Sequence, residues 1–171
     1  SNKMFRLLQG DVGSGKTIVS LMSAYNTVNA GFQVAVMAPT EILSRQHFVL
    51  AKKIFPKNMN IELISGKSEY KSKKNILSKL ANKKIDIIFG THAIFQKKVN
   101  FSKLGLIIID EQHKFGVNQR KRLSDKGGDN CDVLLMTATP IPRTLTMSMY
   151  GDMDLSIIKE KPKSRKPIKT Y

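Results

Sequence analysis

The sequence predicts an α/β fold in which parallel strands alternate with helices. Short apolar runs recur along the 171 residues, and stretches of helical length separate most of them. Such alternation is typical of parallel strands joined by crossover helices, so we expect a mostly parallel sheet. A glycine-rich stretch at 10–17 (G-D-V-G-S-G-K-T) follows the first apolar run and precedes a helical pattern. This strand–turn–helix unit is the usual setting of a phosphate-binding loop.

The first half of the chain begins with an apolar strand at 5–8 and a helix from Thr17 to Ala30, with Gly31 as its C-terminal cap. A β-rich run at 33–38 follows. Thr40 is the expected N-cap of a second helix, which Pro56 ends. The two helices carry their expected apolar residues at helical spacing: Ile18, Leu21, Met22, Tyr25 and Val28 in the first, and Ile42, Leu43, Gln46, Phe48, Val49 and Ile54 in the second.

The second half continues the alternation. Strands are expected at 61–64, 85–89, 104–109, 133–136 and 155–158, and helices at 68–84, 118–125 and 141–150. The helix at 68–84 is rich in lysine and turns Ile76, Leu77 and Leu80 inward. The run at 104–109 has no polar residue after Gly105, which predicts a central strand covered on both faces.

Bulk properties limit the protein class. The chain has 29 Lys and Arg residues and 13 Asp and Glu residues. The resulting net charge of +16 modestly favours a polyanionic partner. Most of this excess is lysine, so solvated surface charge is the alternative. No apolar run could span a bilayer, and the single cysteine, Cys131, permits neither a disulfide nor a cysteine metal cluster. We expect a cytoplasmic protein without a membrane partner.

The loop at 10–17 has the residue types that phosphate binding needs. Glycines at 10, 13 and 15 allow the backbone N–H groups to converge on phosphate oxygens. Lys16 supplies a mobile positive charge, and the Thr17 hydroxyl can bind Mg²⁺. The expected nucleotide-binding set is Gly10, Asp11, Val12, Gly13, Ser14, Gly15, Lys16 and Thr17.

Two adjacent acids, Asp110 and Glu111, directly follow the central apolar run. In a phosphate-loop ATPase, the first acid holds Mg²⁺, partly through water, and the second orients and deprotonates the attacking water. The alternative is that both lie in a solvated loop. His47 is expected to be structural.

Other phosphate-loop classes fit less well. A GTPase should carry N-K-x-D, but the stretch at 82–86 (N-K-K-I-D) has one residue too many. The L-S-G-G-Q signature of ABC-type ATPases is absent, and small-molecule kinases usually lack the adjacent acids.

The strand-end motifs resemble those of superfamily 2 helicases. They are G-D-V-G-S-G-K-T, M-A-P-T-E-I-L, F-G-T-H-A-I-F, D-E-Q-H and M-T-A-T-P-I-P-R-T-L. With D-E-Q-H-K-F-G-V-N-Q-R and Y-G-D-M-D-L-S-I-I-K-E, they are most similar to the first motor domain of the bacterial RecG family. Transcription-repair coupling translocases share T-A-T-P-I-P-R-T-L but usually carry D-E-E-H, so Gln112 favours the RecG family. DEAD-box RNA helicases carry D-E-A-D at that place.

The resemblance implies a RecA-like three-layer αβα domain that uses ATP and Mg²⁺. It implies catalytic roles for Lys16, Asp110 and Glu111, and contacts with the γ-phosphate side and the partner domain for Gln112 and His113. Coupling of hydrolysis to DNA movement would fall to Thr137 and Thr139. The DNA backbone track would contain Pro39, Thr40, Glu41, Gly90, Thr91 and His92.

The resemblance also implies a domain organisation and a cellular role. Residues 1–160 would be the ATP-binding motor domain, and the basic residues 161–171 a linker to a second motor domain outside the chain, as a DNA-binding wedge domain would be. Branched DNA, such as replication forks and Holliday junctions, would be remodelled in repair and recombination. Since the arginine finger of such motors lies in the second domain, this chain alone should hydrolyse ATP poorly. A nucleotide-gated nucleic-acid binding module remains the alternative.

Overall fold

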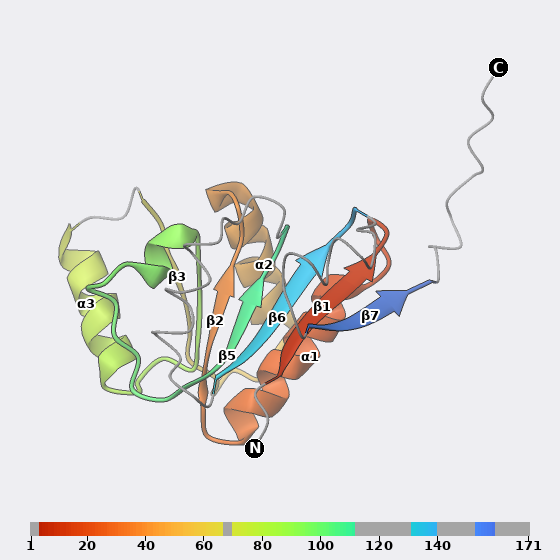
Figure 1. Ribbon diagram of the computed structural model, residues 1–171. Helices are drawn as coiled ribbons and strands as arrows, with labels where there is room; N and C mark the ends of the chain where they lie inside the picture. Colours follow the sequence, from red (N-terminus) through yellow and green to blue (C-terminus); the bar gives the residue numbers. More distant parts are fainter. Residues whose placement is uncertain (1–3, 67–69, 112–130, 140–152, 160–171) are drawn as a thin grey trace.

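The chain folds into a seven-stranded parallel sheet with helices on both faces (Figure 1). A computed structural model describes residues 4–66, 70–111, 131–139 and 153–159. The strand order is β3-β4-β2-β5-β6-β1-β7, and every neighbouring pair is parallel. The strands are β1 (Phe5–Gly10), β2 (Gln33–Met37), β3 (Ile61–Ile64), β4 (Ile87–Gly90), β5 (Leu104–Ile109), β6 (Asp132–Thr137) and β7 (Asp154–Ile158). The expected α/β class and all seven strands are confirmed.

The helices of the described residues are α1 (Lys16–Asn29), α2 (Glu41–Ile54), α3 (Tyr70–Ala81) and a short 3₁₀ helix, η1 (His92–Phe95). The sequence predicted the first three and missed η1. The helices expected at 118–125 and 141–150 lie outside the described residues. Within the described ranges, no helix is long and apolar enough to cross a membrane.

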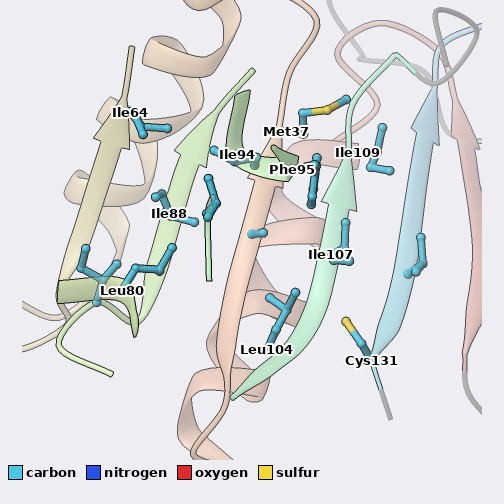
Figure 2. Close-up of a cluster of buried hydrophobic side chains, with 14 of the residues drawn as sticks. Met37, Ile64, Leu80, Ile88, Ile94, Phe95, Leu104, Ile107, Ile109 and Cys131 are labelled. Atoms are coloured by element: carbon cyan, nitrogen blue, oxygen red, sulfur yellow. The ribbon is translucent and has the colours of Figure 1, made fainter. Parts of the chain in front are cut away.

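Two apolar clusters, one on each face of the sheet, form the core. Leu21 and Ala24 of α1 and Ala51 of α2 pack on one face with residues of the central strands. On the other face, Ile76 and Leu80 of α3 pack with Ile94 and Phe95 of η1 and with the opposite side chains of the strands (Figure 2). The arrangement is therefore the expected three-layer sandwich.

The middle strand, β5, is buried along its whole length. Figure 2 shows Leu104, Ile107 and Ile109 pointing into one face of the core, while Leu106 and Ile108 belong to the cluster on the other face. Burial on both faces explains why this run is uniformly apolar instead of alternating. The prediction of a central strand is confirmed.

Helix boundaries follow the expected capping residues. Gly31 has a φ of 83°, and the N–H groups of Gly31 and Phe32 donate to the carbonyls of Val28 and Thr27. These two bonds form a Schellman motif, which satisfies carbonyls that the end of α1 leaves open. At the other cap, the Thr40 hydroxyl accepts from the Leu43 N–H at 3.2 Å, so both predicted caps are confirmed.

The predicted apolar side of α2 is wrong. Four of its six members are exposed: Gln46 and three apolar residues, with exposed fractions of 72% for Ile42, 46% for Val49 and 50% for Ile54. The buried residues of α2 are instead Ser44, His47 and Ala51. A helix that packs close to a sheet needs small residues at the contact, and larger apolar side chains then lie along its flank. This orientation turns His47 toward the strands.

Candidate nucleotide-binding site

Most of the predicted site residues meet at one edge of the sheet. Because all strands are parallel, their carboxyl ends lie at the same edge, where open α/β sheets bind their ligands. The phosphate loop follows β1, the Asp110–Glu111 pair follows β5, and only β6 lies between these strands. At the usual strand spacing the axes of β1 and β5 are about 10 Å apart. This separation suits a nucleotide phosphate chain with a metal ion.

The phosphate loop has the backbone that its glycines predict. Gly13 and Gly15 have φ angles of 79° and 93°, in the left-handed region that favours glycine. Gly15 is the N-cap of α1, and no side-chain bond caps this helix start. The N–H groups of the first turn and the positive end of the helix dipole are thus directed at the loop, where an anion would be stabilised.

The polar atoms inside the loop fit a phosphate group. Lys16 Nζ donates to the carbonyls of Gly10 and Asp11, at 2.5 and 2.8 Å. An ammonium has three N–H donors, so one is left for a phosphate oxygen. Ser14 Oγ is buried without a hydrogen-bond partner among the described residues. A Cβ at Gly10 would come within 2.5 Å of that hydroxyl, so the loop needs glycine there.

Asp110 is held by a histidine from another element. His47 Nε2 lies 2.7 Å from Asp110 Oδ2, and the two side chains are only 11% and 13% exposed. The Asp110 N–H also donates to the Met37 carbonyl at 2.9 Å, which continues the β2–β5 pairing by one residue. The predicted metal-binding acid is therefore fixed through both its backbone and its side chain.

Glu111 has an unusual backbone. Its φ is 54°, in the left-handed region that non-glycine residues rarely occupy. Such a conformation costs about 1–3 kcal/mol, and it is found mostly where function requires a particular direction of a side chain. Here it turns the chain sharply after Asp110, so that two consecutive carboxylates stand at the end of β5.

Thr137 and Thr139 form a local hydrogen-bonded turn after β6. Their hydroxyls lie 2.9 Å apart, and the Thr139 N–H donates to Thr137 Oγ1 at 3.2 Å. Thr137 is fully buried and pairs in register with Gln9, the residue before the phosphate loop. The two threonines are thus brought beside the loop.

The residues expected along DNA also lie together. The Ala38 N–H donates to the Gly90 carbonyl at 3.0 Å, which joins the ends of β2 and β4. Pro39, Thr40 and Glu41 continue from the first strand, and Thr91 and His92 continue from the second into η1. The Glu41 carboxylate also accepts from the Gly66 N–H after β3 at 2.5 Å, so three neighbouring strand ends are connected.

Sequence reasoning expected His47 to be structural and did not foresee its contact with Asp110. The signal available was its spacing: Ser44, His47 and Ala51 recur at helical intervals on one face of α2.

The other two catalytic expectations, Gln112 and His113, lie outside the described residues. Within those residues, no three His, Cys, Asp or Glu side chains form a metal-binding group. A Mg²⁺ ion at Thr17 and Asp110 would thus complete its shell with phosphate oxygens and water, as this ion commonly does.

Comparisons with known proteins agree with this geometry. A family model described as DEAD/DEAH box helicase matches residues 2–148. The chain is 54% identical over 98% of its length to an ATP-dependent DNA helicase RecG of Streptococcus pneumoniae, of which it covers 25%. It is 53% identical to the RecG of Staphylococcus epidermidis, again over 98% of this chain and 24% of the relative. The chain thus spans about a quarter of the length of these curated relatives. The similarity to RecG that the motifs indicated is confirmed.

Solved structures show the same fold. A structure of RecG bound to a three-way DNA junction aligns over 97% of this chain and 22% of that one, with a TM-score of 0.81 and 43% identity. A DEAD box protein from Methanococcus jannaschii aligns over 91% of this chain and 46% of that one, with a TM-score of 0.70. At 21% identity, the second similarity concerns the fold alone.

Proposed function

The chain belongs to the DEAD/DEAH box helicase family, and on that premise we propose that it is the ATP-binding motor domain of a DNA helicase or translocase. The observation that carries the proposal is the meeting of the phosphate loop and the Asp110–Glu111 pair at one sheet edge, with only β6 between their strands. Hydrolysis of ATP would drive the remodelling of branched DNA, such as replication forks and Holliday junctions, in repair and recombination. Such a motor would act in the bacterial cytoplasm.

The phosphate loop would hold the nucleotide. The N–H groups of residues 10–17 and the free donor of Lys16 would bind the β- and γ-phosphates. Thr17 and Asp110 would hold Mg²⁺, partly through water, and the ion would neutralise charge on the phosphates. Glu111 would accept the proton of the attacking water, and its backbone turn would direct its carboxylate for this task. Gln112 and His113 would contact the γ-phosphate side and the partner domain.

DNA would lie along the neighbouring strand ends. The structure of RecG on a three-way junction makes DNA the expected partner, and the net charge of +16 favours a polyanion. Contacts would come from Pro39, Thr40, Glu41, Gly90, Thr91 and His92, and Thr137 and Thr139 would couple hydrolysis to movement. Contacts to the backbone suit a motor that must move over any sequence.

The domain organisation is part of the proposal. Residues 1–160 would form the first motor domain and residues 161–171 a linker to a second one, while a wedge domain would also lie outside the chain. The chain's coverage of about a quarter of its RecG relatives supports this. An arginine finger from a second domain contributes about 10³–10⁵ in rate in comparable enzymes, so the chain alone should bind nucleotide and turn it over slowly.

The proposal is tested by ATP binding and DNA-stimulated ATP hydrolysis, measured for this chain and for the full-length protein. Glu111→Gln should keep ATP binding and abolish turnover in the full-length protein. Glu62→Gln, the same change on the edge strand β3, should keep both ATP binding and turnover. A nucleotide-gated binding module would bind DNA equally well with and without the Glu111 substitution and would show no turnover. Rapid ATP hydrolysis by this chain alone would refute the proposal that a second motor domain is needed for turnover.

The remaining alternative is the motor of a transcription-repair coupling translocase. A motor that is coupled to transcription has no need to distinguish a branched DNA from a linear one. Stimulation of the ATPase by a synthetic three-way junction well above that by a linear duplex of equal length would favour the branched-DNA motor. Equal stimulation by both would count against it.

A further inference from the structure

The contact between His47 and Asp110 joins α2 to the end of β5. A carboxylate only accepts hydrogen bonds, so the His47 Nε2–H is the donor across the 2.7 Å between them. Both groups are about nine-tenths buried, which strengthens the bond and makes its loss costly. The partners are 63 residues apart in sequence, so the contact depends on the packing of α2 against the sheet.

The bond occupies only one of the two carboxylate oxygens of Asp110. Oδ2 of Asp110 is taken by His47, and among the described residues no partner is seen for Oδ1. Holding one oxygen fixes the rotation of the carboxyl group, and hence the direction of the other. Partners of this kind orient metal-binding carboxylates in many proteins, and their loss typically costs about 10–100-fold in metal affinity or activity.

The helix that carries His47 is anchored at the expected DNA track. Thr40 caps α2, and Pro39 and Glu41 flank this cap. His47 lies six residues after Glu41, about 9 Å along the axis at the usual helical rise. A rigid helix therefore connects the residues expected to contact DNA with the residue that holds Asp110.

We propose that His47 is a positioning residue that orients the Asp110 carboxylate for Mg²⁺ and ties this acid to the DNA side of the domain through α2. The proposal rests on the proposed function, because it gives Asp110 its metal. A purely structural pair is the alternative: it would stabilise the fold without altering the use of Mg²⁺.

The decisive measurement is the Mg²⁺ concentration that half-saturates binding of a fluorescent ADP to the full-length protein. His47→Leu removes the donor at similar volume, and His47→Gln keeps an N–H at nearly the same reach. We expect His47→Leu to raise the half-saturating Mg²⁺ concentration roughly 10–100-fold. In His47→Gln, this concentration should return most of the way to that of the unaltered protein. Ser44→Ala is the matched control, since it removes a buried polar atom from the same face of α2 without touching Asp110.

Urea unfolding of the same variants distinguishes a positioning residue from a purely structural pair. A lower unfolding midpoint for His47→Leu with an unchanged Mg²⁺ requirement would overturn the proposal and leave a structural pair. An unchanged requirement in all variants, with normal Mg²⁺-dependent binding by the unaltered protein, would overturn it as well. If the unaltered protein bound no nucleotide with Mg²⁺, the proposed function would fail, and this proposal with it.

The link to DNA is tested by repeating the titration with a synthetic three-way junction. We expect the junction to change the Mg²⁺ requirement of the unaltered protein and of Ser44→Ala, and to leave that of His47→Leu unchanged. If the junction acts equally on all three, the coupling does not pass through His47.

Discussion

Replacement of Gln33 by methionine should lower the free energy of unfolding of the domain strongly, because this one side chain makes four hydrogen bonds to the backbone. Gln33 is fully buried at the start of β2. Its amide nitrogen donates to the carbonyls of Leu80 and Ile85, at 2.9 and 2.8 Å. Its amide oxygen accepts from the N–H groups of Ser102 and Lys103, at 2.8 and 2.9 Å. One side chain thus joins the end of α3, the entry to β4 and the loop before β5.

The expected magnitude follows from the four backbone groups that lose a partner. Methionine has a similar length and volume but no amide, so the packing is kept and the hydrogen bonds are lost. The Ile85 carbonyl is buried, and loss of its amide donor should cost about 1–3 kcal/mol. The Leu80 carbonyl still accepts from the Lys83 N–H at 3.2 Å, so its loss is closer to a net hydrogen bond, about 0.5–1.5 kcal/mol. The two N–H groups are partly accessible to water, so the loss there is closer to a net hydrogen bond, about 0.5–1.5 kcal/mol each. The sum is about 2.5–7.5 kcal/mol, centred on about 5 kcal/mol, a large part of a typical domain stability of about 5–15 kcal/mol.

Urea unfolding followed by circular dichroism measures this loss. With a slope of about 2 kcal/mol/M, a loss of about 5 kcal/mol should lower the unfolding midpoint by about 2.5 M. Gln46→Met is the control, because Gln46 is exposed on α2 and the chemical change is identical. A change within about 0.5 kcal/mol for Gln33→Met, the size usual for surface substitutions, would refute the reasoning that these four bonds hold the three segments together.

Two further substitutions test the strand ends beside the site. Gly90→Ala should lower the free energy of unfolding by an amount typical of an overpacked core, about 1–3 kcal/mol, because the new Cβ would lie 2.6 and 2.7 Å from the side chains of Ile94 and Ile64. No loss in urea unfolding would show that η1 and β3 can move away from β4 at no cost. Thr40→Ala removes the cap of α2 and should cost about 1 kcal/mol, whereas Thr40→Ser should cost much less. Equal losses for both Thr40 variants in the same assay would mean that the methyl group matters instead of the cap.

Periodicity and glycine positions were enough to predict most of the described fold. The apolar runs predicted all seven strands, and the signal was clearest for β2, β4 and β5, because a parallel strand buried on both faces needs a continuous apolar stretch. Gly31 and Thr40 predicted the ends of two helices, since their roles depend on local backbone geometry alone. The backbone of the loop at 10–17 was predicted for the same reason, since it depends on eight consecutive residues.

Features that depend on distant partners could not be predicted. η1 is a single 3₁₀ turn of four residues, too short for a periodic signal. The face of α2 was misassigned because apolar content does not reveal how closely a helix packs on its sheet. The His47–Asp110 contact and the bonds of Gln33 join residues 47 to 70 positions apart, and Glu111 adopts a glycine-like φ without a glycine to signal it.

The position of β1 in the sheet has a consequence for biosynthesis. This strand is made first, yet both of its neighbours, β6 and β7, come from the end of the chain. The Met4 N–H, just before β1, donates to Asp132, 128 residues away. At a ribosomal rate of about 5–20 residues per second, β1 waits roughly 6–25 s for its first pairing partner. The strand that precedes the phosphate loop therefore joins the sheet only after β6 has been made, and a chain interrupted before β6 would leave this apolar strand unpaired.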